Sequence, residues 1–285
     1  MKPMLEALDL RYSYPGTRKE ALRSLTLTIP QGKKTAICGH NGSGKSTFFL
    51  HAIGIHRPAS GQLKLKGAPL SYRRDDLLRL RRQVGLVFQD PEQQLILNTP
   101  YEDVSYGLRN AGLPEDEIAV RTERMLLSMG LKPLADTPIH QLSLGQKKRV
   151  ALAGVLVLEP ELLLLDEPTA YLDRLSERQL LEELDLAQEQ GITVAMATHD
   201  MNLAYAWADW VLVMDQGVCC MAGPPHEVFA DEEKLRQLGL EPPMLLELWQ
   251  ALPAAVRKSH APPRSIEAMK AFLQNGYGGV GALSQ

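Results

Sequence analysis

Nine residues from Gly39 to Thr47, GHNGSGKST, combine three glycines with a lysine and with serine and threonine side chains. They follow a short apolar run at 35–38 that reads as a strand, and they precede an apolar segment at 48–55 that reads as a helix. Glycines let backbone N–H groups turn toward an anion, and a following helix directs its free N–H groups at the same anion. We therefore predict a phosphate-binding loop, with a chance glycine turn as the alternative.

Four positions of this loop fit the pattern G-x-x-x-x-G-K-[ST], namely Gly39, Gly44, Lys45 and Ser46. In that pattern the lysine reaches the β- and γ-phosphates of a nucleotide, and the hydroxyl ligates Mg²⁺. We expect nucleotide contacts from Asn41, Gly42, Ser43, Gly44, Lys45, Ser46 and Thr47. The pattern by itself does not distinguish a kinase from a motor protein or a GTPase.

Two adjacent carboxylates, Asp166 and Glu167, follow a run of leucines at 162–165 and precede Pro168. Such a run suits a buried parallel strand, and ligands of open α/β sheets bind where these strands end. We predict that Asp166 completes the Mg²⁺ shell through water and that Glu167 polarises an attacking water as a general base. An acidic turn without chemistry is the alternative.

The elements that must position these residues alternate between strand-like and helix-like patterns. Strands are predicted at 5–14, 22–29, 35–38, 62–66, 84–88, 162–165, 193–197 and 210–214. Helices are predicted at 48–55, at about 101–140 with breaks at Pro114 and Pro133, at 146–158 and at 176–190. This alternation predicts an α/β fold with a parallel sheet. After Gly223 the strand and helix pattern gives way to short amphipathic segments separated by proline pairs. We therefore expect one domain over 1–223 and a short helical extension over 224–285.

The composition is that of an ordinary globular protein, with 45% hydrophobic and 23% charged residues among 285. A net charge of -3 without a basic stripe argues against a nucleic-acid partner. Arginines between Arg73 and Arg82 read as a solvated helix face beside Asp75 and Asp76. The longest apolar run, 150–158, is about half of what a membrane-spanning helix needs, and no signal peptide is visible. We expect such a chain to act at a membrane only through a partner.

The segment Leu142–Gln146, LSLGQ, makes the reading specific, because beside the two nucleotide motifs it resembles the LSGGQ signature of ATP-binding cassette ATPases. Other elements stand in that family's order. The resemblance implies that Tyr14 stacks on adenine, that Gln89 links Mg²⁺ to a partner and that His199 contacts the γ-phosphate. It makes Asp173 the aspartate of the family's D-loop. The cofactors that it implies are ATP and Mg²⁺.

The same resemblance covers about residues 4–223 and implies a P-loop ATPase core with a helical signature subdomain at about 95–158. Ser143 lies just before the predicted helix, so we expect its hydroxyl and the N–H of Gly145 to face outward as a second anion site. In the family, the signature of one copy closes over the ATP held by the loop of the other.

A head-to-tail homodimer with two sites is therefore implied, with Ser143, Gly145 and Gln146 as contacts to the partner's nucleotide. Two residues depart from the family pattern. Leu144 stands where the family usually has glycine, and Tyr171 replaces the usual small residue of the D-loop. We expect Leu144 to point away from the phosphate and Tyr171 to lie at the dimer seam.

Three further segments resemble the energy-coupling-factor branch of these ATPases, namely Asp90–Gln94, Gln146–Ala151 and Gly223–Phe229. In that branch two ATPases bind a transmembrane coupling protein, which holds a small substrate-binding membrane protein. Among its members the chain looks most like the cobalt-importing ATPase. The resemblance implies a position at the cytoplasmic face of the cell membrane, held through these partners, and a C-terminal extension that helps to hold the dimer.

Several alternatives stay open. Asp90 and Glu92 are candidates to receive basic residues of the coupling protein, and a solvated loop is the other interpretation. The chain could instead serve a conventional importer with a soluble binding protein, or act as an ATP-driven clamp outside transport. An apolar stripe in the extension is expected to be buried, in the dimer or on its own cassette. It consists of Leu245, Leu248, Trp249 and Leu252.

Overall fold

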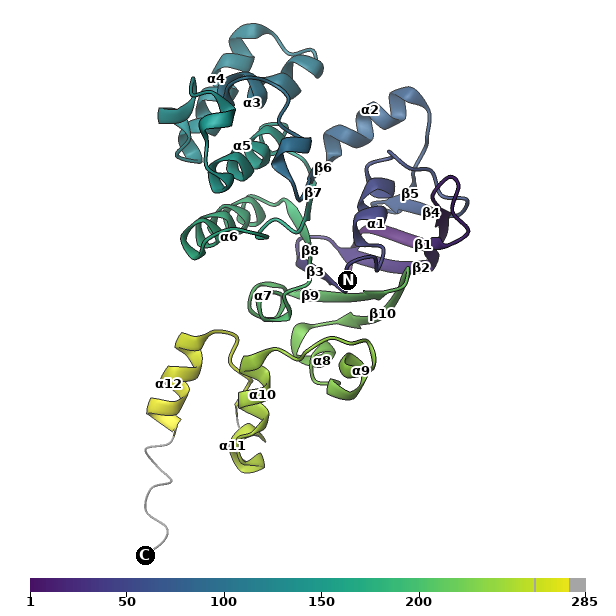
Figure 1. The fold of residues 1–285 in the computed structure, drawn as a ribbon, viewed down its shortest axis with the longest axis vertical. Coiled ribbons are helices and arrows are strands. Elements are labelled where there is room, and N and C mark those ends of the chain that lie inside the picture. The colour runs from purple at the N-terminus through teal and green to yellow at the C-terminus, as the bar shows by residue number, and fades with distance from the viewer. Residues whose placement is uncertain (259, 277–285) are drawn as a thin grey trace, which may run out of the picture.

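A six-stranded sheet forms the centre of the computed structural model, which describes residues 1–258 and 260–276 (Figure 1). Its strand order is β10-β9-β3-β8-β7-β6. The strands are β3 (Lys34–Cys38), β6 (Val84–Val87), β7 (Leu162–Asp166), β8 (Thr193–Thr198), β9 (Trp210–Asp215) and β10 (Val218–Gly223). Neighbours from β9 to β6 pair in parallel, and β10 is antiparallel to β9. The predicted α/β fold with a parallel sheet is confirmed.

The register of this sheet decides where the chemistry can lie. Cys38, the last residue of β3, pairs with Thr198 of β8, and Asp166 of β7 pairs with Ala197. The residues that follow β3, β7 and β8 therefore leave the sheet at the same edge. The four leucines of β7 are fully buried, which fits a strand covered on both faces.

A second, antiparallel sheet packs against the first through one helix. It has the order β2-β1-β4-β5. The bounds are β1 (Pro3–Ser13), β2 (Glu20–Pro30), β4 (Ser60–Leu65) and β5 (Ala68–Pro69). The helix is α1 (Lys45–Ala52), whose Phe48 and Phe49 are fully buried in one apolar cluster with residues of both sheets. This burial fixes the helix that begins at the glycine loop.

Helices between β6 and β7 make a lobe of their own, at the upper left of Figure 1. They are α3 (Pro100–Asn110), α4 (Glu115–Ser128) and α5 (Leu144–Leu156), with short 3₁₀ turns η1 (Pro91–Gln93), η2 (Lys132–Leu134) and η3 (Ile139–Gln141). The predicted proline breaks are confirmed, since α4 begins after Pro114 and Pro133 lies in η2. The signature helix α5 starts two residues before the predicted Gln146, because Ser143 caps it.

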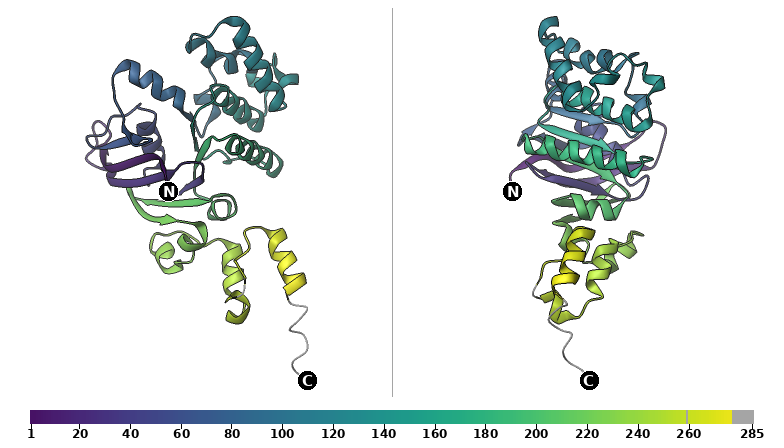
Figure 2. Two further views of the ribbon diagram at one scale, coloured as in Figure 1. Left: turned by 180° about the vertical axis from the view of Figure 1, so that it is seen from behind. Right: turned by 90° about the vertical axis from the view of Figure 1, so that its left-hand side faces the viewer.

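Five further helices follow β10 and lie at the end of the molecule opposite the helical lobe (Figures 1 and 2). They are α8 (Pro225–Val228), α9 (Glu232–Gln237), α10 (Met244–Gln250), α11 (Ala254–Lys258) and α12 (Ile266–Gly276). The remaining helices are α2 (Arg74–Gln83), α6 (Arg174–Glu189) and α7 (Met201–Trp207). Residues 277–285 of the predicted extension lie outside the described residues. In the part that is described, no helix combines the length and apolar character needed to cross a membrane.

The buried stripe predicted for the extension is only partly right. Leu246 and Trp249 are the buried residues of α10, and Leu248 is 54% exposed. Leu245 and Leu252 pack against the core from partly buried positions. The reason is helical geometry: Leu248 lies two residues, or about 200°, from Leu246 and so faces the opposite side.

The extension is fastened to the elements that follow the glycine loop and β8. The backbone N–H of Met244 donates to the Asn202 side chain on α7 at 2.8 Å. The ring of His40 lies 3.1 Å, from Nε2, from the carbonyl oxygen of Leu238. The Arg264 guanidinium donates to the carbonyls of Tyr205, Ala206 and Ala208, where α7 ends. A cation at a helix C-terminus also satisfies the free carbonyls and the negative dipole end.

We predict that Arg264→Ala detaches α12 without unfolding the cassette. Hydrogen bonds to a charged group contribute about 1.5–3 kcal/mol, so opening of this segment should become about 10- to 150-fold more frequent. Amide hydrogen exchange across 260–276 measures this opening. Lys270→Ala, an exposed change on the same helix, is the control, and equal exchange in the two variants would contradict the anchoring role.

Candidate nucleotide-binding and hydrolysis site

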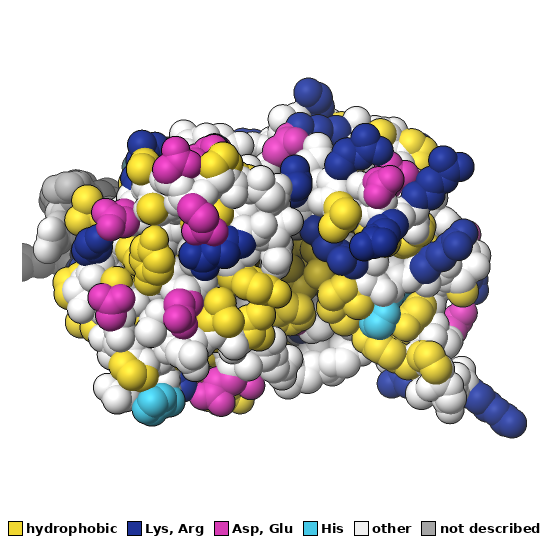
Figure 3. Space-filling model, turned by 90° about the horizontal axis from the view of Figure 1, so that it is seen from above, with side chains coloured by type: hydrophobic (Ala, Val, Ile, Leu, Met, Phe, Trp, Pro, Cys, Tyr) yellow, Lys and Arg dark blue, Asp and Glu magenta, His cyan; other side chains and the backbone are white. Residues whose placement is uncertain are grey.

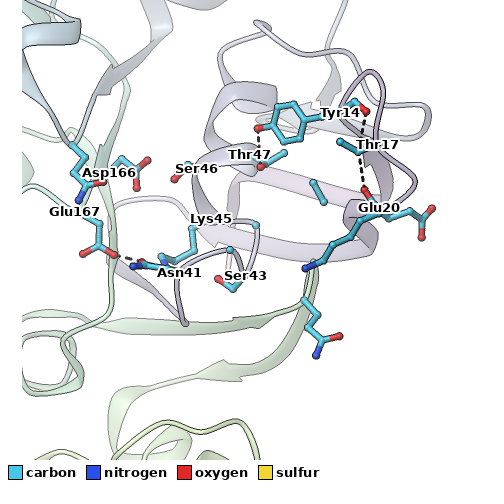
Figure 4. A pocket seen from close by; sticks show the side chains of 16 residues that line it. Tyr14, Thr17, Glu20, Asn41, Ser43, Lys45, Ser46, Thr47, Asp166 and Glu167 are labelled. Carbon is cyan, nitrogen blue, oxygen red and sulfur yellow. Dashed lines mark hydrogen bonds and ion pairs between the residues drawn. The ribbon is translucent and has the colours of Figure 1, made fainter.

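A cleft of about 380 Å³ opens between the glycine loop, the start of β2 and the end of β7 (Figure 4). In Figure 4 the side chains of Asp166 and Glu167 come from one side and that of Tyr14 from the other, with Lys45 between them. The cleft collects most of the predicted site residues. These are Tyr14, Asn41, Gly42, Ser43, Gly44, Lys45, Ser46, Thr47, Gln89, Asp166 and Glu167.

The glycine loop has a backbone that side chains would block. Gly39 has a φ of 149°, and a Cβ there would lie 2.2 Å from the carbonyl oxygen of Met214. Gly44, at a φ of 107°, would place a Cβ 2.9 Å from the carbonyl oxygen of Ala21. The loop also holds the Ser43 hydroxyl, which is buried and lacks a hydrogen-bond partner among the described residues. A tight glycine loop with a spare polar group fits a bound phosphate.

The Lys45 side chain, 5% exposed, lies inside the loop. Its ammonium donates to the carbonyls of Gly39 at 2.6 Å and His40 at 3.1 Å, and it lies 3.7 Å from Glu167 Oε1. At this distance the attraction is about 4 kcal/mol with an effective dielectric of ~20, while burying each ion costs several kcal/mol. The ion pair alone therefore does not fix Lys45, and the two carbonyl contacts hold its head group at the cleft floor.

Glu167 is buried, 6% exposed, with its two carboxylate oxygens in different surroundings. Oε2 lies 2.8 Å from Nδ1 of His199, and Oε1 has no hydrogen-bond partner in the described part of the chain. Its backbone is left-handed, with a φ of 46°. One oxygen is thus held by a histidine, and the other is a desolvated acceptor aimed at the cleft, as a general base requires.

Three residues predicted to hold Mg²⁺, Ser46, Gln89 and Asp166, line the same cleft. Burial raises the pKa of Asp166, with a smaller contribution from Glu167, against the lowering effects of a hydrogen bond from Ser46 and of Lys45. A hydroxyl, an amide and a carboxylate supply the oxygen ligands that Mg²⁺ prefers. The donor set therefore fits the ion.

Tyr14 stands at the rim of the cleft, 37% exposed. Its hydroxyl lies 3.1 Å from the Thr47 hydroxyl, and its ring meets those of Tyr12 and His56 edge-on. Beneath it, His51 is fully buried, its Nδ1 2.7 Å from the Thr47 carbonyl oxygen; burial lowers the pKa of this imidazole. The Tyr14 ring, partly exposed and held by these neighbours, can therefore stack one face on the adenine of a nucleotide.

Part of the cleft wall is made by residues outside the predicted set. Thr17 and Lys19 lie in the turn that follows Tyr14, and Glu20 begins β2, so all three are close in sequence to a predicted site residue. Gln216 comes from the turn between β9 and β10, and nothing near it in the sequence signals a nucleotide. It joins the wall only because β9 lies beside β3 in the sheet.

The signature residues do not line this cleft. The Ser143 hydroxyl accepts from the N–H of Gln146 at 3.3 Å, and the Gln146 side chain accepts from the N–H of Ser143 at 2.9 Å. Ser143 is exposed at the start of α5, and its hydroxyl also completes a capping box there. Its contact with a partner's nucleotide stays a prediction. Gly145 is buried, and a Cβ there would lie 2.7 Å from the Ser176 hydroxyl of α6.

Residues near the signature, at the starts of α5 and α6, are either exposed or act as helix caps. Asp173 accepts from the N–H groups of Leu175 and Ser176 and so caps α6. Leu144 is 38% exposed and Tyr171 is 87% exposed, the latter with a φ of 63°. The chain thus has one cleft with phosphate-binding features and, elsewhere, an uncovered surface made by the starts of α5 and α6.

Comparison with known proteins agrees with this geometry. The family model described as ABC transporter matches residues 22–170. A cobalt import ATP-binding protein of Rhodobacter capsulatus is 44% identical over 277 residues, covering 96% of this chain and 98% of that protein. An energy-coupling factor transporter ATP-binding protein of Methanospirillum hungatei is 39% identical over 282 residues, covering 98% of this chain and 71% of that protein.

Solved structures give the same answer. The structure of cbiO1 from Clostridium perfringens, described as part of the ABC transporter complex cbiONQ, matches with a TM-score of 0.74 and 42% identity. The match covers 88% of this chain and 100% of that one. A dimeric ATP-binding cassette in a post-hydrolysis state with ADP and phosphate matches with a TM-score of 0.70 and 28% identity, covering 78% and 99%. The chain belongs to the ABC transporter family, as an ATP-binding subunit of the energy-coupling-factor and cobalt-import type, and it is an ATPase.

Proposed function

We propose that this chain hydrolyses ATP with Mg²⁺ between two copies of itself and thereby drives a membrane importer. The observation that carries the proposal is the state of Glu167, a buried carboxylate whose Oε2 lies 2.8 Å from His199 Nδ1. Its Oε1 has no hydrogen-bond partner among the described residues and lies 3.7 Å from the Lys45 ammonium in the nucleotide cleft. A site for nucleotide binding alone needs no such acceptor. Its place beside Lys45 puts it next to the predicted γ-phosphate position.

In this mechanism the residues of one chain divide the work. The Lys45 ammonium and the loop N–H groups bind the phosphates and offset their charge. Oε1 of Glu167, which has no hydrogen-bond partner among the described residues, accepts a proton from the attacking water, while His199 keeps the carboxylate oriented. Ser46, Gln89 and Asp166 would hold Mg²⁺, which neutralises charge on the phosphates when bound.

The second half of the site would come from the partner copy. Ser143 and Asp173 lie at the starts of α5 and α6, away from the cleft, and Leu144 and Tyr171 expose apolar area beside them. A surface of this kind suits a two-fold contact in which each signature covers the other copy's nucleotide. We propose that Gly145 and Gln146 take part, and that the extension after Gly223 helps to hold the two copies together.

A membrane partner is supported by an apolar groove between the helical lobe, which carries α5, and the part of the molecule that carries α1 and α2. Figure 3 shows hydrophobic side chains in the hollow between the lobes and many Lys and Arg on the lobe to the right. The groove has a volume of about 370 Å³. It is lined by Ile53, Ile55, Leu86, Phe88, Val155 and Leu158, together with other residues. We propose that a cytoplasmic segment of the coupling protein docks here and places this chain at the cytoplasmic face of the membrane.

The acidic loop beside this groove is already engaged within the chain. Asp90 accepts from the N–H of Glu92 and caps η1. The Glu92 carboxylate, 70% exposed, lies 2.6 Å from the Lys147 ammonium. We propose that Glu92 makes only a secondary contact with the coupling protein, since a basic residue of that partner would have to compete with Lys147.

Cobalt is the proposed cargo, and the support is the name of the Rhodobacter relative. Among the described residues, no group of three acidic, cysteine or histidine side chains is placed to hold a metal ion. Uptake of Co²⁺ and Ni²⁺ in cells carrying the chain with its membrane partners separates the cargoes. Uptake of neither ion would overturn the cargo assignment.

We predict that Glu167→Gln keeps ATP binding and loses turnover. The amide matches the carboxylate in shape but cannot take a proton, so kcat should fall about 10²- to 10⁴-fold with the Kd for ATP little changed. A stable ATP-bound dimer should accumulate, which size-exclusion chromatography detects. Glu182→Gln, a change on the exposed face of α6, is the matched control. Normal turnover in Glu167→Gln would refute this assignment.

We predict that Lys45→Ala weakens nucleotide binding. Losing the charge-assisted contacts to phosphate should cost about 1.5–3 kcal/mol, or about 10- to 150-fold in Kd. Isothermal titration calorimetry with ATP measures it, with the exposed Lys33→Ala as a control from the same strand–loop segment. An unchanged Kd would show that the glycine loop is not the phosphate site.

A further inference from the structure

A second buried lysine, outside the nucleotide motifs, approaches the catalytic turn. Lys148 lies on the signature helix α5 and is 3% exposed. Its ammonium donates to the carbonyls of Pro168 and Ala170, both at 2.8 Å, and lies 3.4 Å from that of Glu167. It makes no ion pair within the described residues. All three donors of a buried cation therefore go to one backbone turn.

That turn has a conformation that needs support. Glu167 and Tyr171, at its two ends, have left-handed backbones with φ of 46° and 63°. L-residues disfavour this region, and they keep it only where the surroundings hold them. The turn bends three carbonyls toward one point, where their negative ends repel one another. The Lys148 ammonium fills that point and offsets the repulsion.

The same contact joins two functional surfaces. Lys148 follows Gln146 by two residues on the helix that Ser143 caps, and its head group lies against the turn that carries Glu167. A shift of α5 would move the Lys148 ammonium and the three carbonyls that it contacts. The backbone of Glu167, the proposed general base, would move with them. By contrast the adjacent Lys147 points elsewhere and pairs with Glu92.

We propose that Lys148 is a positioning residue for hydrolysis, which holds the turn 167–171 so that Glu167 faces the nucleotide and which links this turn to the signature helix. The inference rests on the proposed role of Glu167 as the base. Lys148 itself touches no reacting atom.

The charge state of Lys148 supplies an independent readout. Burial lowers the pKa of this ammonium to about 8, against the raising effects of Glu167, which follows β7, and Asp90, which precedes η1. As pH rises through that value the group loses its charge and one of three donors. The proposal thus expects kcat to fall on the alkaline side with a midpoint near 8, while the Kd for ATP stays level.

The test compares the full-length wild type with Lys148→Met, which keeps the apolar stem, and Lys148→Gln, which restores two N–H donors. Lys132→Met removes an exposed lysine from the same lobe and is the matched control. The measurements are kcat and KM for MgATP from pH 6.5 to 9.5, the Kd for ATP and the melting temperature. We expect kcat of Lys148→Met to fall at least ten-fold while its Kd for ATP stays within about three-fold of the wild type. The fall of kcat near pH 8, the alkaline limb of the pH profile, should be absent from this variant. Lys148→Gln should recover part of the lost kcat.

Three outcomes would overturn the proposal: wild-type kcat in Lys148→Met, a loss of kcat that is matched by loss of ATP affinity or of folding in both variants, or an alkaline limb that survives in Lys148→Met. Glu167→Gln measured alongside separates the two assignments. If that variant turns over normally, the base is misassigned; if it is inactive while Lys148→Met is normal, only the positioning role fails.

Discussion

The parallel pairing of β3, β7 and β8 is the constraint on which the site depends. It sends the glycine loop, the carboxylate pair and His199 out of the sheet at one edge. The glycine loop lies more than a hundred residues before the other two segments in the sequence, yet Lys45 and His199 each come within ion-pairing or hydrogen-bonding distance of Glu167. Because the strands are buried on both faces, a slip in register would exchange the side chains packed on the two faces and disrupt both layers, so the register is strongly specified.

Electrostatics at that edge is unusual in being mostly backbone-mediated. Lys45 and Lys148 are both buried ammonium groups, and each is held by loop carbonyls. One lies on the nucleotide side of Glu167, and the other lies behind the turn that carries it. Carbonyls stabilise a buried cation without neutralising it, so positive charge remains available near a site that receives phosphates.

The nucleotide cleft also reaches the far end of the chain. His40, the second residue of the glycine loop, contacts the Leu238 carbonyl, and Arg264 binds the end of α7, which follows His199. The extension is thus bonded to segments that adjoin the cleft on two sides. A C-terminal piece attached in this way differs from a loosely tethered tail, and its helices share the apolar core through Leu246 and Trp249.

Local sequence was sufficient for the glycine loop, the leucine strand with its carboxylates and the helix breaks at proline, because each depends on backbone chemistry within about ten residues. The family resemblance supplied the signature and its partners. Only the tertiary structure decided that Lys148 is buried while Lys147 pairs with Glu92. It also decided that the Ser143 hydroxyl caps α5 and that Gln216 lines the cleft. Those outcomes depend on which distant segments pack against each side chain, and the hydrophobic periodicity of the sequence does not encode these contacts.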